Sequence, residues 1–403
     1  MRVKLKPLHE QSIVITGASS GIGLTTATMA AKRGASVLLV ARDEEALRGI
    51  RDRLRAEGGR VEYAAADVAD ADEMQRVVAA AIDSFGGIDT WVNNAGVGLY
   101  SDLLEVSRED HERVFQTNYW GVVNGTQAAA RYMLRHGGGA IVNIGSVLSD
   151  VATTPLGAYS ASKHAVKGFT HAFRLEMLQR HAPISVALVK PSGINSPWTE
   201  HAKNYMPDRA RVPPMVYAPE TVARAILFAA THPCRDLVVG SSGAALTAFS
   251  HWLPRAADRV FAALLPPLHF DRSRPAVASD NLYSPAGDGE RYSDHRLVRK
   301  HSLYAAMQRR PLLSLGIAAL AGAAVWAALR QRRQRHTVTA RAASAAAVPL
   351  ATLAAALGAL KARVSPPRTR TAAVTAAVAS GWRTQKRQLR RGTRRAMESV
   401  GLH

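Results

Sequence analysis

Four side chains in the middle of this sequence have the types and spacing of a proton-transfer site. Tyr159 and Lys163 lie four positions apart in the stretch YSASK, so a helix would place them on one face. Ser146 precedes Tyr159 by 13 residues, and Asn118 lies further upstream in FQTNYWG. A tyrosine beside an ammonium could exchange a proton with a carbonyl oxygen while a serine hydroxyl orients that oxygen. Taken alone, Tyr-x-x-x-Lys is equally compatible with a solvated pair on a helix surface.

A glycine-rich turn near the N-terminus could bind the other reactant. The apolar run SIVIT at 12–16 leads into TGASSGIG at 16–23 and then into a helical run. Glycines between a strand and a helix let the backbone approach a pyrophosphate, to which the helix N-terminus offers free N–H groups. The alternative is a purely structural turn. The residues expected to form this dinucleotide site are Thr16, Gly17, Ser19, Ser20, Gly21, Ile22 and Gly23.

The elements that position these residues alternate between short apolar runs and helical segments. The runs are continuous rather than alternating, which is typical of strands covered on both faces. Several of the helical segments end at glycine, a common helix stop signal. We therefore expect an α/β fold of the Rossmann type, a doubly wound and mostly parallel seven-stranded sheet, followed by a helical C-terminal extension. The expected strands are 12–16, 35–41, 60–67, 88–94, 140–146, 184–190 and 236–240.

The spacing Gly-x-x-x-Gly-x-Gly after a threonine resembles that of the short-chain dehydrogenase/reductase family. AADV at 65–68, NNAG at 93–96, Asn118 and the set of Ser146, Tyr159 and Lys163 resemble further family segments in the same order. The resemblance covers residues 9 to about 245 of the chain. It implies an oxidoreductase that transfers hydride between a nicotinamide cofactor and a ketone, aldehyde or secondary alcohol.

The resemblance also implies the role of each catalytic residue. Tyr159 would be the general acid in reduction and the general base in oxidation, with its pKa lowered by the Lys163 ammonium. Lys163 would hold the nicotinamide ribose, and Ser146 would stabilise the substrate oxygen. Asn118 would hold a water that connects Lys163 to solvent. Further cofactor contacts are implied for Asp67, Val68, Asn94, Ala95, Gly96, Tyr159, Lys163, Pro191, Gly193, Ile194 and Ser196.

Two residues depart from the family pattern, and a third indicates which nicotinamide cofactor is bound. PSGINSPW at 191–198 has Ser192 where the family has glycine and Ser196 where it has threonine. The second strand ends in Ala41 and Arg42, without the acid that binds the ribose 2′-hydroxyl of NAD. Because a guanidinium can bind a 2′-phosphate, we expect NADP(H) to be preferred over NAD(H). The alternative is that Arg42 merely begins an exposed loop.

The variable loop that follows is expected to define the substrate. Residues 195–218 contain Trp198, Tyr205, Met206 and Met215, which could line an apolar pocket or pack the loop onto the domain. We expect a small-molecule carbonyl or alcohol with an apolar body. No metal site is expected.

The strong positive charge of the chain is concentrated in its last quarter. The whole chain carries +21, but residues 301–403 hold 18 Lys and Arg and a single acid, Glu398. Such a tail could bind nucleic acid through phosphates, yet it lacks interleaved aromatic residues, so nucleic acid is not the expected partner. The competing hypothesis is a non-enzymatic NADP(H)-binding scaffold whose basic tail binds nucleic acid or an anionic surface.

Composition divides the chain into five parts. We expect a catalytic domain at 1–245, an apolar helical segment at 246–268, a polar linker at 269–303, a transmembrane or interfacial helix within 304–336, and an Ala-rich basic tail at 337–403. The uncharged run 312–329 has marginal spanning length and arginines on both sides. A buried or oligomer-interface helix is the alternative.

These patterns lead to an expected location for the protein. We expect membrane association with the catalytic domain in the cytoplasm, the alternative being a cytoplasmic protein. The family resemblance implies a homo-oligomer.

Overall fold

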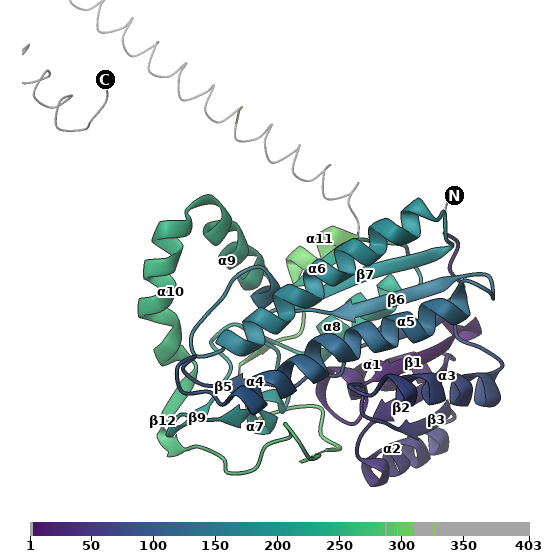
Figure 1. Cartoon of the computed structure of the whole chain (residues 1–403), viewed down its shortest axis with the longest axis horizontal. Helices are drawn as coiled ribbons and strands as arrows, with labels where there is room; N and C mark the ends of the chain where they lie inside the picture. Colours follow the sequence, from purple (N-terminus) through teal and green to yellow (C-terminus); the bar gives the residue numbers. More distant parts are fainter. Residues whose placement is uncertain (1–2, 287, 296, 310–325, 327–403) are drawn as a thin grey trace, which may run out of the picture. The chain divides into compact units, whose positions relative to one another are not determined.

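A seven-stranded parallel sheet forms the centre of the described chain (Figure 1). The computed structural model describes residues 3–286, 288–295, 297–309 and Trp326. The strand order is β3-β2-β1-β4-β6-β7-β11, so the expected doubly wound α/β fold is confirmed. These strands are β1 (Ser12–Thr16), β2 (Ser36–Ala41), β3 (Arg60–Ala65), β4 (Thr90–Asn93), β6 (Gly139–Ile144), β7 (Ile184–Pro191) and β11 (Asp236–Val239).

Helices cover both faces of the sheet, which explains the continuous apolar runs of its strands. Side chains of α1, α2 and α8 share one apolar core with the sheet, and those of α3, α5 and α6 share a second core. Strand order reverses between β1 and β4, and in such sheets ligands bind at the carboxyl ends of the strands beside that point. The helices are α1 (Gly21–Ala31), α2 (Glu44–Ala56), α3 (Ala71–Phe85), α4 (Arg108–Phe115), α5 (Gly121–Met133), α6 (Gly157–Gln179), α7 (Trp198–His201) and α8 (Pro219–Ala229).

The chain after β11 folds back onto the domain. Helices α9 (Ser241–Trp252) and α10 (Pro254–Leu268) form a hairpin beside the sheet (Figure 1), where the sequence predicted one apolar helical segment at 246–268. The described residues of the segment expected as a linker at 269–303 also pack onto the domain. Two short strands of this segment form backbone hydrogen bonds with short strands of the substrate loop. These pairs are β12 (Phe270–Pro275) with β9 (Asp208–Ala210) and β13 (Val298–Arg299) with β10 (Val216–Tyr217). A last two-stranded pair joins β5 (Leu99–Tyr100) to β8 (Lys203–Asn204).

The first residues of the segment expected at 304–336 also belong to the domain. Helix α11 (Leu303–Arg309) lies against β11, where the Gln308 amide donates to the Val238 carbonyl and accepts from the Val238 N–H. Among the residues described by the structure, no helix combines the length and apolarity of a membrane span. Apart from Trp326, the run 312–329 and the basic tail at 337–403 lie outside the described residues, so membrane association stays a prediction from sequence.

Candidate active site and cofactor cleft

The predicted proton-transfer residues come together at the carboxyl end of β6. Helix α6 carries Tyr159 and Lys163, and Ser146 lies just beyond β6. The Ser146 hydroxyl hydrogen-bonds the Tyr159 phenol, and the Lys163 Nζ lies 5.7 Å from the centroid of the Tyr159 ring. Lys163 is 3% exposed and donates to the Ile144 carbonyl at 2.9 Å. The spacing on YSASK therefore corresponds to a buried lysine and a half-buried tyrosine at the end of the sheet.

Asn118 connects the loop after β4 to helix α6. It lies in a π-helical turn, Gln116–Trp120, and is completely buried. Its side chain donates to the Val97 carbonyl at 3.0 Å and to the Ser162 hydroxyl at 3.1 Å, and it accepts from the Val97 N–H at 2.8 Å. These bonds fix the position of α6 relative to the loop. The water relay to Lys163 stays a prediction.

Burial dominates the acid–base properties of the two α6 residues. It raises the pKa of Tyr159 to about 12, and the hydrogen bond from Ser146 opposes that rise. Burial also lowers the pKa of Lys163 to about 8. We expected the Lys163 ammonium and an oxidised nicotinamide to lower the phenol pKa; in this structure burial raises that pKa, and the opposing effect comes from Ser146. Tyr159 is thus held in its protonated form, which suits a proton donor.

The pKa of Lys163 predicts how activity depends on pH. Because the ammonium is the form below about 8, kcat/KM for the cofactor in the reductive direction should fall as pH rises through that value. The measurement is kcat/KM between about pH 6 and pH 10. In Lys163→Arg, whose guanidinium keeps its charge, the falling limb should move to higher pH. A limb at the same pH in that variant would assign it to another group.

A large apolar cavity opens onto Ser146 and Tyr159. Its volume is about 610 Å³. The α9–α10 hairpin supplies much of its wall through Leu246, Phe249, Leu265 and Leu268. The sequence did not predict this wall, because the apolar pattern of a helical hairpin does not specify the surface against which the hairpin packs.

The substrate-loop residues divide between the cavity and the body of the domain. Trp198 and Met215 line the cavity, which is the first of the two alternatives that the sequence left open. Tyr205 and Met206 follow the alternative of packing on the domain: the Tyr205 phenol donates to Asp110 at 2.7 Å, and Met206 packs against an apolar cluster that includes Tyr100 and Phe270.

The glycine-rich turn between β1 and α1 forms one side of a second cleft. Gly17 has φ of +63°, and a Cβ there would lie 2.7 Å from the Ala95 Cα. A Cβ on Gly23 would lie 1.9 Å from the Gly17 carbonyl oxygen. Only glycine fits at these positions. The backbone of the turn consequently carries no side chains there that would keep a ligand away from it. Together with the N-terminus of α1, this shape fits a dinucleotide pyrophosphate.

Most residues predicted to hold the cofactor line one of the two hollows. Thr16 and Gly23 instead lie behind the turn, where the Thr16 hydroxyl accepts from the N–H groups of Asn94 and Ala95. The residues lining the cleft are Gly17, Ser19, Ser20, Gly21, Ile22, Arg42, Asp67, Val68, Asn94, Ala95, Gly96 and Ser196. Those lining the apolar cavity are Tyr159, Lys163, Pro191, Gly193 and Ile194, with Gly96, Asn94, Ile22 and Ser196 shared between the two hollows.

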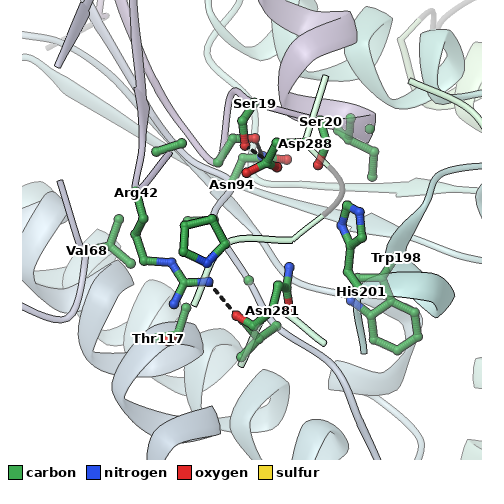
Figure 2. Close-up of a pocket in the computed structure, with 18 of the residues that line it drawn as sticks. Ser19, Ser20, Arg42, Val68, Asn94, Thr117, Trp198, His201, Asn281 and Asp288 are labelled. Carbon is green, nitrogen blue, oxygen red and sulfur yellow. Dashed lines mark hydrogen bonds between the residues drawn. The ribbon is translucent and has the colours of Figure 1, made fainter. Parts of the chain in front are cut away.

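A segment from the far end of the domain also enters the cleft. We call residues 281–286 and 288–290 the strap, and three of its side chains, Asn281, Pro285 and Asp288, line the cleft. Figure 2 shows Asn281 beside Arg42 and Asp288 beside Ser19. Sequence reasoning missed the strap, because its polar, Pro- and Gly-containing composition is typical of a linker.

Comparison with known proteins agrees with this geometry. The family described as short chain dehydrogenase matches residues 11–207. The uncharacterized oxidoreductase YxnA of Bacillus subtilis is 40% identical over 336 residues, which are 82% of this chain and 94% of YxnA. That similarity extends well beyond the family match, into the α9–α10 hairpin and the strap.

Two solved structures are similar to the described domain. One is a short-chain dehydrogenase/reductase from Burkholderia phymatum in complex with NAD, with a TM-score of 0.57 and 26% identity, covering 64% of this chain and 96% of that one. The other is an alcohol dehydrogenase from Thermococcus sibiricus complexed with 5-hydroxy-NADP, with a TM-score of 0.51 and 25% identity, covering 57% of this chain and 96% of that one.

Proposed function

Because this chain belongs to the short-chain dehydrogenase/reductase family of oxidoreductases, we propose that it transfers hydride between NADP(H) and an apolar ketone, aldehyde or secondary alcohol. The observation that carries the proposal is that Ser146, Tyr159 and Lys163 together line an apolar cavity of about 610 Å³. A scaffold that only bound the cofactor would need neither a proton donor nor a cavity beside it. The scaffold hypothesis is therefore not favoured.

Each catalytic side chain has a distinct task in the proposed reaction. A bound nicotinamide supplies or accepts the hydride. The Tyr159 hydroxyl gives its proton to the carbonyl oxygen during reduction and takes one from the alcohol during oxidation. The Ser146 hydroxyl donates to the same oxygen and stabilises its developing charge. Lys163 favours the phenolate that is left behind and holds the ribose.

The lining of the cavity supports a substrate with a large apolar body. Purified protein should be tested with NADPH on a series of aliphatic and cyclic ketones of increasing size. We expect kcat/KM to rise with apolar size, since each buried methylene contributes about 0.8 kcal/mol. Absence of turnover across the whole series, in either direction and with either cofactor, would refute the proposed activity.

Arg42 supports the preference for NADP(H). It lines the cleft at the end of β2, where Ala41 takes the place of an acid. Replacing Arg42 by alanine should lower the ratio of kcat/KM with NADPH to kcat/KM with NADH by about 10- to 100-fold, because a hydrogen bond to a charged group is worth about 1.5–3 kcal/mol. The ratio is the useful measurement, since it cancels effects that both cofactors share. An unchanged ratio would show that Arg42 does not cause the proposed preference for NADP(H).

A further inference from the structure

The strap binds the groups of the cleft that were predicted to bind phosphate. The guanidinium of Arg42 donates to the carbonyls of Asn281, Leu282 and Tyr283, the last at 2.9 Å. At the glycine-rich turn, the Ser19 hydroxyl donates to the Asp288 carboxylate at 2.7 Å. The oxygen atoms of the strap thus accept the hydrogen bonds that the oxygens of a phosphate would accept.

The strap also joins the backbone of the turn. The N–H of Gly21, at the start of α1, donates to the Glu290 carbonyl at 2.8 Å, and the N–H of Gly289 donates to the Ser19 carbonyl at the same distance. Free N–H groups at a helix N-terminus are the usual partners of a pyrophosphate. The strap therefore satisfies a donor that a cofactor would use.

The space left in the cleft is small for half of a dinucleotide. Its volume is about 160 Å³. Sites for small molecules and cofactors usually measure about 300–1,000 Å³. An adenosine with its phosphates could take the cleft only if the strap moved away.

Other contacts hold the strap from outside the cleft. The Tyr283 hydroxyl donates to Asp110 at 2.8 Å, and Arg113 donates to the Leu282 carbonyl at 3.0 Å. These anchors can be weakened without altering a side chain that lines the cleft.

We propose that the strap is a built-in competitor for the phosphate-binding groups of the cofactor cleft, and that NADP(H) binds by displacing it. This inference rests on the proposed function for the identity of the cofactor. To bind, NADP(H) must replace the strap both at Arg42, which would bind the 2′-phosphate, and at the hydrogen-bond donors of the turn. NAD(H) needs only the donors of the turn, so the strap opposes NADP(H) more strongly than NAD(H).

Two variants of the full chain test the competition from different ends of the strap. Asp288→Ala removes the carboxylate at Ser19, and Tyr283→Phe removes the anchor on Asp110. We expect Asp288→Ala to lower the Kd for NADPH by about fivefold or more, since the lost bond involves a charged group. Tyr283→Phe should lower it by a smaller factor. In Asp288→Ala, which frees a donor of the turn that both cofactors need, NADH should gain about as much as NADPH. In Tyr283→Phe, which loosens the carbonyls bound to Arg42, NADH should gain less than NADPH. Kd is measured by fluorescence titration, with Asp294→Ala, an exposed acid four residues beyond the strap, as the matched control.

Competition is overturned if Kd for NADPH rises, because the strap would then be a lid that contributes to binding. It is also overturned if Kd is unchanged in both variants. If wild type and variants bind neither NADPH nor NADH, the proposed function itself fails. If only the proposed competition is refuted, the wild-type protein still binds the cofactor. The two results are therefore distinguishable.

A second measurement uses the unaltered protein. If the strap is displaced, NADPH should accelerate tryptic cleavage after Arg291, which follows it in the chain. Slower cleavage in NADPH than in buffer would contradict displacement. This readout needs no variant and so does not depend on how well a variant folds.

Discussion

Tyr159→Phe should reduce the rate of carbonyl reduction by about 10²- to 10⁴-fold, the range that one general acid contributes. The substitution removes only the phenolic oxygen, which accepts the Ser146 hydrogen bond and is the only proton donor that the proposed mechanism assigns. The ring would keep its edge contact with Trp198, whose ring centroid lies 5.0 Å away. We therefore expect the loss in kcat and an almost unchanged Kd for NADPH.

The test compares kcat and NADPH binding in Tyr159→Phe with those in a matched variant. Tyr132→Phe is suitable, because Tyr132 of α5 stacks on His136 just beyond the helix and lines neither hollow. Tyr132→Phe should keep wild-type kcat. Near-normal turnover in Tyr159→Phe would show that another group supplies the proton.

Asp150→Ala should lower the free energy of unfolding by about 3–5 kcal/mol, more than any other substitution proposed above. The Asp150 side chain is 6% exposed and accepts from Lys167 at 2.5 Å and from Lys190 at 2.6 Å. The Lys190 side chain is itself only 9% exposed, so removing the carboxylate leaves a buried ammonium without its counter-charge. Asp52→Ala is the matched control, because Asp52 pairs with Arg51 at the surface and should cost less than about 1 kcal/mol.

The contribution of Asp150 should depend on pH with a definite sign. Burial raises the pKa of its carboxyl group, but hydrogen bonds from Lys167 and Lys190 outweigh burial, and the net pKa is lowered. A lowered carboxyl pKa gives stability that is present above the unfolded pKa of about 3.9 and is lost as pH falls through the folded pKa. Urea unfolding of wild type and Asp150→Ala should therefore differ most near neutral pH and converge in acid. A constant difference down to about pH 3 would exclude the carboxylate as its source.

The sequence by itself determined the sheet and the reactive pair. Covered parallel strands must be apolar along their whole length, so continuous runs such as 184–190 identified β7, which the structure gives as Ile184–Pro191. The glycines at 17 and 23 were identifiable because the turn between β1 and α1 has a fixed length and leaves no room for side chains. Tyr159 and Lys163 were identifiable because helix geometry fixes the direction of residues four positions apart.

Only the tertiary structure decided what surrounds that pair. Asn118 was predicted to be a site residue, but its bonds to Val97 and Ser162 come from a π-helical turn that no sequence period describes. The α9–α10 hairpin became the wall of the cavity by docking, and the strap reached Arg42 and Ser19 from about 240 and 270 residues away. Hydrogen bonds between polar groups so distant in sequence have no periodicity and no local spacing. They exist only once the chain has folded, and for that reason the composition of the strap indicated a linker while its contacts occupy the cofactor cleft.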